Sequence, residues 1–346
     1  MTKVDIKSLN LVELKNYISE FDKAYRAKQI YEWLHVKLAS SFDDMTNLPK
    51  SLRETLDEKC ELNSLKLLDK LESKDGGTKK FLFELKDGNV LESVLMRYEH
   101  GNSVCISSQV GCKMGCKFCA STLDGFERNL TASEMLSQIY RIQEITGERV
   151  SNVVVMGIGE PLDNLSNLLK FVEILTDENG LNISQRNITV STCGLVDKIK
   201  ELADKKPQFT LAISLHAPND EDRKALMPIA RRYSIKELMD ACKYFYDKTG
   251  RRITFEYSMV EGANDSESHA RQLISLIKGL NCHVNLIPVN PIKEREFKQT
   301  KAKYIQTFKN ILEKNHINVT IRREMGADIN AACGQLRKSY MDESSI

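Results

Sequence analysis

From residue 103 onward, apolar β-like runs alternate with amphipathic helical runs, and this alternation constrains the fold more than any other feature. Six strand candidates run from SVCISSQ to HVNLIPVN, and VTIRRE follows as a late further strand. The helical run TASEMLSQIYRIQEITG begins with a capping box, Thr131-x-x-Glu134, and ends at Gly147. The run SIKELMDACKYFYDKTG likewise begins with a capping box, Ser234-x-x-Glu237, and ends at Gly250. The alternation predicts a parallel α/β fold, either a barrel or an open sheet. The carboxyl ends of the strands would then share one rim, where sites on such folds gather.

The first hundred residues predict two further units of different character. In residues 1–70, apolar residues recur at helical spacing, as in YRAKQIYEWLHVKLAS, and we expect a small helical domain. Residues 71–100 contain two β-like runs, KKFLFEL and VLESVLMRY, around a turn with Asp87-Gly88, which predicts a short β-hairpin extension. Residues 101–346 would form the main α/β unit. Glu92 falls within the second β-like run, where an isolated carboxylate usually faces solvent.

Composition gives no sign of a strongly charged or membrane-bound protein. The 346-residue chain is 41% hydrophobic and 28% charged. Its formal net charge of +2 is too small to attract nucleic acid or an anionic membrane by overall charge alone. It has no apolar run long enough to span a bilayer and no secretory leader pattern, which predicts a cytoplasmic protein. Its nine cysteines favour metal-binding or catalytic thiols in a reducing compartment over a disulfide scaffold.

Three cysteines, Cys112, Cys116 and Cys119, form a C-x3-C-x2-C pattern directly after a β-like run. Three thiolates are too few to close a tetrahedral zinc site or to fill every corner of a four-iron cluster. The shortage favours a cluster with one iron open to a substrate. The alternative is a zinc knuckle, which would need a fourth Cys or His nearby, and Cys193 is a distant candidate. A further thiol, Cys105, lies seven residues upstream of the pattern.

Glycine and polar residues stand at the end of nearly every strand candidate. They include Gly157-Ile-Gly159-Glu160-Pro161, Ser191-Thr-Cys193-Gly194, Ser214-Leu-His216, Glu256 and Asn290-Pro291. Glycines allow the backbone to approach a ligand closely, and a carboxylate accepts hydrogen bonds from an ammonium group. The rim of the sheet is therefore the predicted site.

The cysteine pattern, with Phe118 before its last cysteine, resembles the signature of the radical S-adenosylmethionine (SAM) superfamily. The runs SSQVGCKMGCKFCAST, GFERNL, MGIGEPLDN, AISLHAPND and AACGQL together resemble the RlmN/Cfr family of RNA adenosine methyltransferases, from about residue 20 to residue 336. The resemblance implies that the α/β fold is a partial (β/α)6 radical SAM barrel. It also implies a 4Fe-4S cluster held by Cys112, Cys116 and Cys119, with SAM bound at the open iron.

The resemblance also assigns residues to SAM binding. By position, the implied contacts are Gly159, Glu160, Ser191, Ser214, Leu215, His216 and Asn290. The chain departs from the commoner family pattern at Cys193, where many relatives have serine. A ligand or redox role for Cys193 is one interpretation, and a tolerated exchange of small residues is the favoured one.

The family reaction uses two more thiols and a base, and the chain has matching residues. Considered locally, Cys105 is a core strand residue and Cys333 is a buried thiol near a helix end. The resemblance instead implies that one SAM molecule methylates Cys333 and that Cys105 later resolves the adduct, leaving a disulfide. It implies that Glu92 is the proton acceptor. A second SAM molecule, split reductively to a 5′-deoxyadenosyl radical, activates the methylthio group for addition to the electron-poor C2 of adenine.

The implied substrate is RNA, and the resemblance makes residues 101–346 the catalytic barrel and residues 1–70 an accessory RNA-recognition domain. The composition of residues 1–70 fits a packing cap on the catalytic domain equally well. Gly159-Glu160-Pro161-Leu162 resembles the RlmN branch, which methylates C2, whereas Cfr, which methylates C8, usually has alanine at the position of Pro161. The expected product is 2-methyladenosine, at adenosine 2503 of 23S rRNA and adenosine 37 of tRNA. The alternatives are Cfr-like C8 methylation and, from another class, a non-catalytic iron–sulfur or zinc module that binds RNA. Further expectations are a reductase or flavodoxin-type electron donor, no membrane partner and a monomeric state.

Local basic clusters are the candidates for RNA contacts, and they are Arg231-Arg232, Arg251-Arg252, Arg322-Arg323 and residues 293–303. Each such cluster is more often a solvated surface than a phosphate site. The target base must leave its stack to reach a buried radical, so base extrusion is expected.

Overall fold

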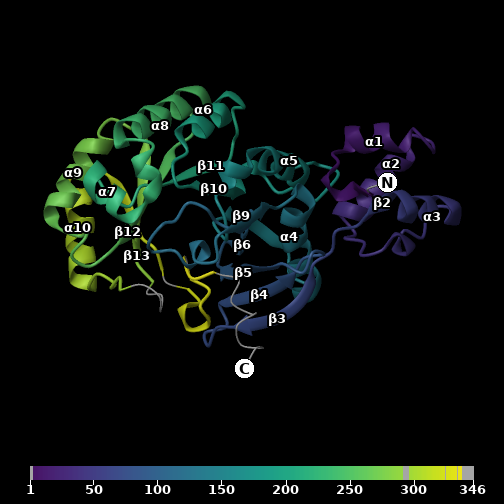
Figure 1. The fold of residues 1–346 in the computed structure, drawn as a ribbon, viewed down its shortest axis with the longest axis horizontal. Coiled ribbons are helices and arrows are strands. Elements are labelled where there is room, and N and C mark those ends of the chain that lie inside the picture. Colours follow the sequence, from purple (N-terminus) through teal and green to yellow (C-terminus); the bar gives the residue numbers. More distant parts are fainter. Residues whose placement is uncertain (1–2, 291–295, 324, 333, 337–346) are drawn as a thin grey trace.

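The computed structural model describes residues 3–290, 296–323, 325–332 and 334–336, and these residues are organised around a ten-stranded sheet (Figure 1). Its parallel strands follow one another across the sheet in chain order. They are β6 (Gly101–Ile106), β9 (Val150–Val155), β10 (Ile188–Thr192), β11 (Thr210–Ser214), β12 (Ile253–Met259), β13 (Cys282–Pro288) and β14 (Asn318–Ile321). The parallel α/β class and every strand candidate from SVCISSQ to VTIRRE are therefore confirmed.

Helices connect consecutive parallel strands and follow the outside of the curved sheet (Figure 1). The two predicted capping boxes are present, because Thr131 and Ser234 each exchange hydrogen bonds with the glutamate three residues on. Gly147 and Gly250 end these helices at φ values of 67° and 66°. The connecting helices are α4 (Ala132–Thr146), α5 (Leu165–Leu175), α6 (Val196–Asp204), α7 (Asp220–Leu226), α8 (Ile235–Thr249), α9 (Glu267–Ile277) and α10 (Ala302–Lys314).

An antiparallel extension continues the sheet beyond β6. The predicted hairpin is confirmed as β4 (Thr78–Glu84) and β5 (Val90–Tyr98), and β5 pairs with β6. A further strand, β3 (Lys66–Glu72), pairs with β4, so residues 66–70 are strand although their segment was expected to be helical. β3 is an edge strand with mostly exposed side chains, and it therefore lacks the alternating apolar pattern by which strands are recognised.

The amino-terminal segment contains the helices that periodicity predicts. They are α1 (Leu11–Ile18), α2 (Arg26–His35) and α3 (Lys50–Lys59), with the 3-10 turns η1 (Ile6–Ser8) and η2 (Phe42–Asp44) between or before them. A short parallel pair of strands, β1 (Val4–Asp5) and β2 (Cys60–Glu61), joins the two ends of the segment. The segment packs against the barrel through His35, which is fully buried and whose Nδ1 lies 2.8 Å from the Tyr140 hydroxyl on α4.

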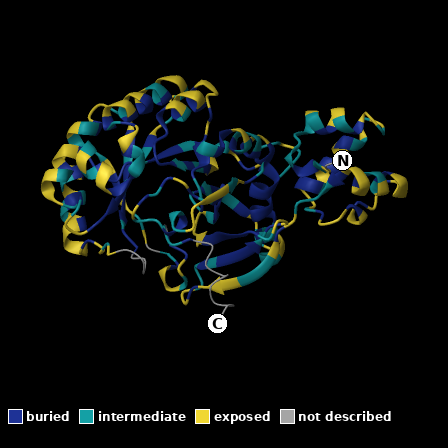
Figure 2. Ribbon diagram, viewed as in Figure 1, coloured by how far each residue is buried: buried dark blue, intermediate teal, exposed yellow. Residues whose placement is uncertain are grey.

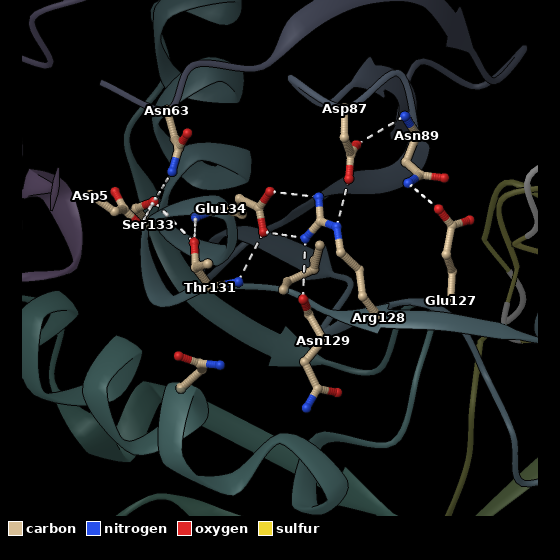
Figure 3. A network of polar contacts seen from close by, with 12 residues as sticks. Asp5, Asn63, Asp87, Asn89, Glu127, Arg128, Asn129, Thr131, Ser133 and Glu134 are labelled. Carbon is tan, nitrogen blue, oxygen red and sulfur yellow. Dashed lines mark hydrogen bonds and ion pairs between the residues drawn. The ribbon is translucent and has the colours of Figure 1, made fainter. Parts of the chain in front are cut away.

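A polar network ties the amino-terminal segment, the start of α4 and the β4–β5 turn together (Figure 3). On one side, the Ser133 hydroxyl donates to the Asp5 carboxylate at 2.7 Å. On the other side, the Arg128 guanidinium donates to both carboxylate oxygens of Glu134, each at 2.8 Å, and to Asp87 at 2.6 Å. Arg128 belongs to the GFERNL run, so that run connects the hairpin extension with the barrel.

The core lies between the strands and the inward faces of the helices, whose outward faces are exposed (Figure 2). The strand ends and the antiparallel extension border two cavities that are described below. No helix in the described ranges has both the length and the apolar character needed to cross a bilayer.

Candidate active site

The three cysteines of the C-x3-C-x2-C pattern lie on a loop that a small hairpin holds in place. The hairpin pairs β7 (Gln109–Gly111), directly before the loop, with β8 (Phe126–Asn129), shortly after it. The backbone N–H of Cys112 donates to the Gly125 carbonyl at 2.8 Å. Gly111 has a φ of +72°, and a Cβ atom there would lie 1.9 Å from that carbonyl oxygen. Glycine is therefore required where the strand enters the loop.

The Cys112, Cys116 and Cys119 side chains line one cavity, the first two buried and Cys119 half-buried. Burial raises the pKa of the Cys112 thiol to about 12 and raises the pKa of Cys116 well above its usual range, and neighbouring thiolates add to both shifts. Three thiolates at this place therefore need a strong positive centre to balance them. This donor set fits a soft metal centre such as an iron–sulfur cluster.

Among the described residues, no group of three or more Cys, His, Asp or Glu side chains converges as the ligands of a single metal ion do. The ligands of a four-iron cluster meet a different requirement, because each thiolate binds its own iron at a separate corner. A loop that distributes three thiols around one cavity is compatible with that requirement.

The cavity lies at the carboxyl ends of the parallel strands and has a volume of about 930 Å³, including its open mouth. Leu215 is not among its described lining residues; it is fully buried, and its backbone N–H donates to the Glu256 carbonyl at 3.1 Å. The other predicted SAM contacts all line the cavity, and their role in binding stays a prediction. They are Gly159, Glu160, Ser191, Ser214, His216 and Asn290.

Glu160 is held in the cavity wall by backbone groups. Its Oε2 accepts from the Cys193 N–H at 2.7 Å, and its Oε1 accepts from the Leu162 N–H at 3.0 Å. Its own N–H donates to the Gln109 side chain at 2.8 Å. The preceding Gly159 has a φ of +106°, and a Cβ there would lie 2.5 Å from the Gln109 Cβ. Burial raises the pKa of Glu160, so a cationic ligand group in the cavity would stabilise its ionised form.

His216 presents a neutral imidazole to the same cavity. Its Nδ1 accepts from the Ser258 backbone N–H at 3.0 Å, so the ring proton resides on Nε2. Burial lowers the pKa of His216 to about 3. Phe118, from the cysteine loop, packs against the ring edge-to-face with the centroids 4.7 Å apart. His216 therefore offers a fixed N–H donor beside the thiols.

Arg223 of α7 is a buried cation near the thiols that no sequence motif distinguished. Its Nη2 donates to the Cys193 carbonyl at 2.7 Å, and its Nε donates to the Leu215 carbonyl at 3.3 Å. Its charge lowers the pKa of the Cys116 thiol and so opposes part of the effect of burial. Arg223 thus ties the ends of β10 and β11 together and brings positive charge toward the cysteine loop. The run DEDRKAL has no feature that separates Arg223 from a surface arginine.

Comparison with known proteins places the chain in a family. The sequence model of the radical SAM superfamily matches residues 106–274, and that of the ribosomal RNA large subunit methyltransferase N-terminal domain matches residues 4–62. A relative from Lachnospira eligens, named "Probable dual-specificity RNA methyltransferase RlmN", is 66% identical over 98% of this chain and 97% of its own length. The chain belongs to the RlmN family.

Another RlmN relative and a solved structure are similar over nearly the whole chain. A Clostridium botulinum protein of the same name is 57% identical over 98% of this chain and 99% of its own. The crystal structure of a radical SAM methyltransferase from Sphaerobacter thermophilus has a TM-score of 0.93 at 44% identity, covering 97% of this chain and 100% of that one. The expected partial radical SAM barrel is therefore confirmed.

A second cavity in this RlmN-family chain adjoins the first. Cys105 of β6 lines it, together with Val94 of β5 and the carboxyl-terminal residues Met325, Ala331, Ala332 and Leu336. Arg322 and Arg323, which read as a solvated surface cluster in the sequence, also line this cavity. The two cavities share four lining residues, Met156, Ile287, Asn290 and Arg322.

Glu92 faces the interior, so the local interpretation of a solvent-facing carboxylate is wrong. Its side chain is 1% exposed and pairs with the Lys80 ammonium of β4 at 3.0 Å. Along β5, Glu92 shares a face with Val94, which lies directly opposite Cys105 on β6. Glu92 and Cys105 therefore face the same side of the sheet, and the role of Glu92 as proton acceptor stays a prediction.

Cys333, the expected methyl acceptor, lies outside the described residues, and its pairing with Cys105 stays a prediction. Its described neighbours divide between the cavities, because Ala332 lines the second cavity and Gly334 lines the first. The Gly334 carbonyl accepts from the Ala120 N–H at 2.8 Å, next to the last cysteine of the loop. The two residues that flank position 333 thus line the two adjoining cavities, one each.

Proposed function

We propose that this RlmN-family chain is a radical SAM RNA methyltransferase that forms 2-methyladenosine at adenosine 2503 of 23S rRNA and adenosine 37 of tRNA. The observation that carries the proposal is the adjacency of two cavities, one lined by three thiols and the other by Cys105, with the residues around position 333 lining both. The relatives' name, a dual-specificity RNA methyltransferase, supports two kinds of RNA substrate. Pro161, in the wall of the first cavity, supports C2 over C8.

The first cavity would hold both cofactors. Cys112, Cys116 and Cys119 would bind a 4Fe-4S cluster, and Glu160 and His216 would bind polar groups of SAM. When bound, these groups would supply the methyl group, the radical chemistry that activates the methylthio carbon, and a one-electron acceptor for the addition to C2. The protein keeps the reacting groups in a fixed, largely buried setting, which excludes competing reactions with water.

Cys333, Glu92 and Cys105 would carry the polar steps. The Cys333 thiolate accepts the methyl group, whose carbon then becomes bonded to C2 of adenine. Glu92 takes the proton from C2. The Cys105 thiolate attacks the Cys333 sulfur; a sulfur–sulfur bond forms, the sulfur–carbon bond breaks with its electron pair going to carbon, and a proton completes the methyl group. An external electron donor, such as a reductase or flavodoxin, returns two electrons to the disulfide before the next turnover.

Identification of the modified nucleoside tests the proposal directly. Anaerobically loaded protein is incubated with SAM, a reductant and either 23S rRNA or tRNA that lacks the modification, and the digested RNA is analysed by mass spectrometry. We expect 2-methyladenosine in both RNAs. Formation of 8-methyladenosine would contradict the C2 assignment, and protein that contains iron and SAM yet forms no methyladenosine would sink the proposal.

Cysteine variants test the assigned roles. Cys333→Ala should lose RNA methylation and keep its iron, and Cys105→Ala should accumulate a covalent protein–RNA adduct that denaturing gels detect. Cys282→Ala is the matched control, because Cys282 is a buried strand cysteine that lines neither cavity. Normal turnover by Cys105→Ala would show that another group resolves the adduct.

A further inference from the structure

Lys80 of β4 is a buried cation that the proposed reaction does not yet use. Its ammonium lies 3.0 Å from the Glu92 carboxylate, and the two side chains are 7% and 1% exposed. Moving a charge out of water is costly, so a buried carboxylate stays ionised only where a cation or hydrogen-bond donors compensate it. Lys80 supplies such compensation to Glu92.

Strand register places these groups on one face of the sheet. Lys80 lies directly opposite Val94 on β5, and Val94 lies directly opposite Cys105 on β6. Directly paired residues of antiparallel strands point to the same side, so Lys80, Glu92 and Cys105 share a face. Val94 and Cys105 also pack with Ala331 in a small apolar cluster, which brings the carboxyl-terminal segment onto this face.

The Lys80 ammonium also contacts that segment, because it donates to the Asn330 carbonyl at 3.4 Å. Close by, a Cβ on Gly326 would lie 2.7 Å from the Thr78 Cγ2, so the segment lies directly against β4. Asn330 stands three residues before position 333. Lys80 therefore links the predicted proton acceptor with the segment that carries the predicted methyl acceptor.

We propose that Lys80 is a positioning residue for Glu92. It keeps the Glu92 carboxylate ionised and holds it in the orientation that accepts the C2 proton of the substrate adenine. The inference rests on the proposed function, which makes Glu92 the proton acceptor. Glu92 takes no part in methylation of Cys333, so Lys80 should matter only after that step. Lys79 provides a matched control, because it points to the other face of β4 and pairs with Glu72 at 3.7 Å.

The test compares Lys80→Met and Lys80→Gln with Lys79→Met in the loaded enzyme. Mass spectrometry of the protein gives the methyl content of Cys333, and analysis of digested RNA gives the rate of methyladenosine formation. We expect both Lys80 variants to lose about 100-fold or more in RNA methylation, the scale of a general acid–base contribution, with normal Cys333 methylation. Lys80→Arg, which keeps the charge, should recover much of the rate, and Lys79→Met should match the wild type.

Three outcomes would overturn the inference, and a fourth would refute the proposed function instead. Lys80 variants as active as Lys79→Met would overturn it, and so would parallel loss of Cys333 methylation and RNA product, since Lys80 would then only support folding of the segment. In a Glu92→Gln background, Lys80→Met should cause little further loss, because both residues act at one step; an independent further loss would also overturn it. Wild-type enzyme that forms no methyladenosine would instead refute the proposed function.

Discussion

Replacement of Gly111 by alanine measures how strongly the β7–β8 hairpin supports the cysteine loop. At a φ of +72°, a residue with a Cβ costs about 1–2 kcal/mol more than glycine. The new Cβ would also lie 1.9 Å from the Gly125 carbonyl oxygen, so that carbonyl must move. Because the carbonyl accepts the Cys112 N–H, its displacement removes a hydrogen bond worth about 0.5–1.5 kcal/mol. We therefore expect Gly111→Ala to lower the free energy of unfolding by about 1.5–3.5 kcal/mol.

Gly125→Ala is the matched control for this substitution. Gly125 lies in the same hairpin at a φ of +71°, and a Cβ there meets nothing within 4 Å, so only the conformational cost applies. Urea unfolding gives the free energies, and iron analysis after anaerobic reconstitution reports on the loop. Gly111→Ala should hold less iron because Cys112 shifts, whereas Gly125→Ala should hold the wild-type amount. Equal unfolding free energies and equal iron content in the two variants would refute the reasoning.

Two further predictions concern the thiols and a buried histidine. Cys119→Ala should lower the iron content and visible absorbance of the reconstituted protein, whereas Cys242→Ala, in α8 and outside both cavities, should leave them unchanged. Burial lowers the pKa of His35 to about 3 from its ordinary 6.5. Between these two pH values the unfolded chain therefore binds a proton at His35 more readily than the folded chain does. Stability should fall as pH drops below about 6.5, by up to about 1.4 kcal/mol per unit from this group. His35→Gln should flatten that dependence in urea unfolding at pH 7 and pH 5.5; an unchanged pH dependence would count against this account.

Features encoded by neighbouring residues were predictable from the sequence. The capping box at Thr131 and the strand-end run Gly159-Glu160 depend on local backbone preference, and both have the expected structure. The same locality explains the rim, because consecutive parallel strands must bring their carboxyl ends to one edge. The prediction of the cofactors and of the order of the reaction steps came instead from the family resemblance.

Features that depend on tertiary pairing were not predictable in this way. Lys79 and Lys80 are adjacent and chemically identical, and only the register of β4 against β5 decides which one is buried beside Glu92. Likewise, the sequence predicts that Arg322 belongs to a surface cluster. In the structure it directly follows β14 and lines both cavities. A single sequence also does not reveal that Leu215 turns into the core while its neighbours line the cavity.

The contact between Gly334 and Ala120 has a consequence for synthesis of the chain. Gly334 completes the wall around the thiols, yet it is translated roughly 200 residues after Cys119. At about 5–20 residues per second, the ribosome needs roughly 10 to 40 s to cover that distance. During this interval the nascent cysteine loop lacks the wall that Gly334 supplies in the finished fold. The hydrogen bond between the Ala120 N–H and the Gly334 carbonyl can therefore form only after every strand of the sheet has been translated.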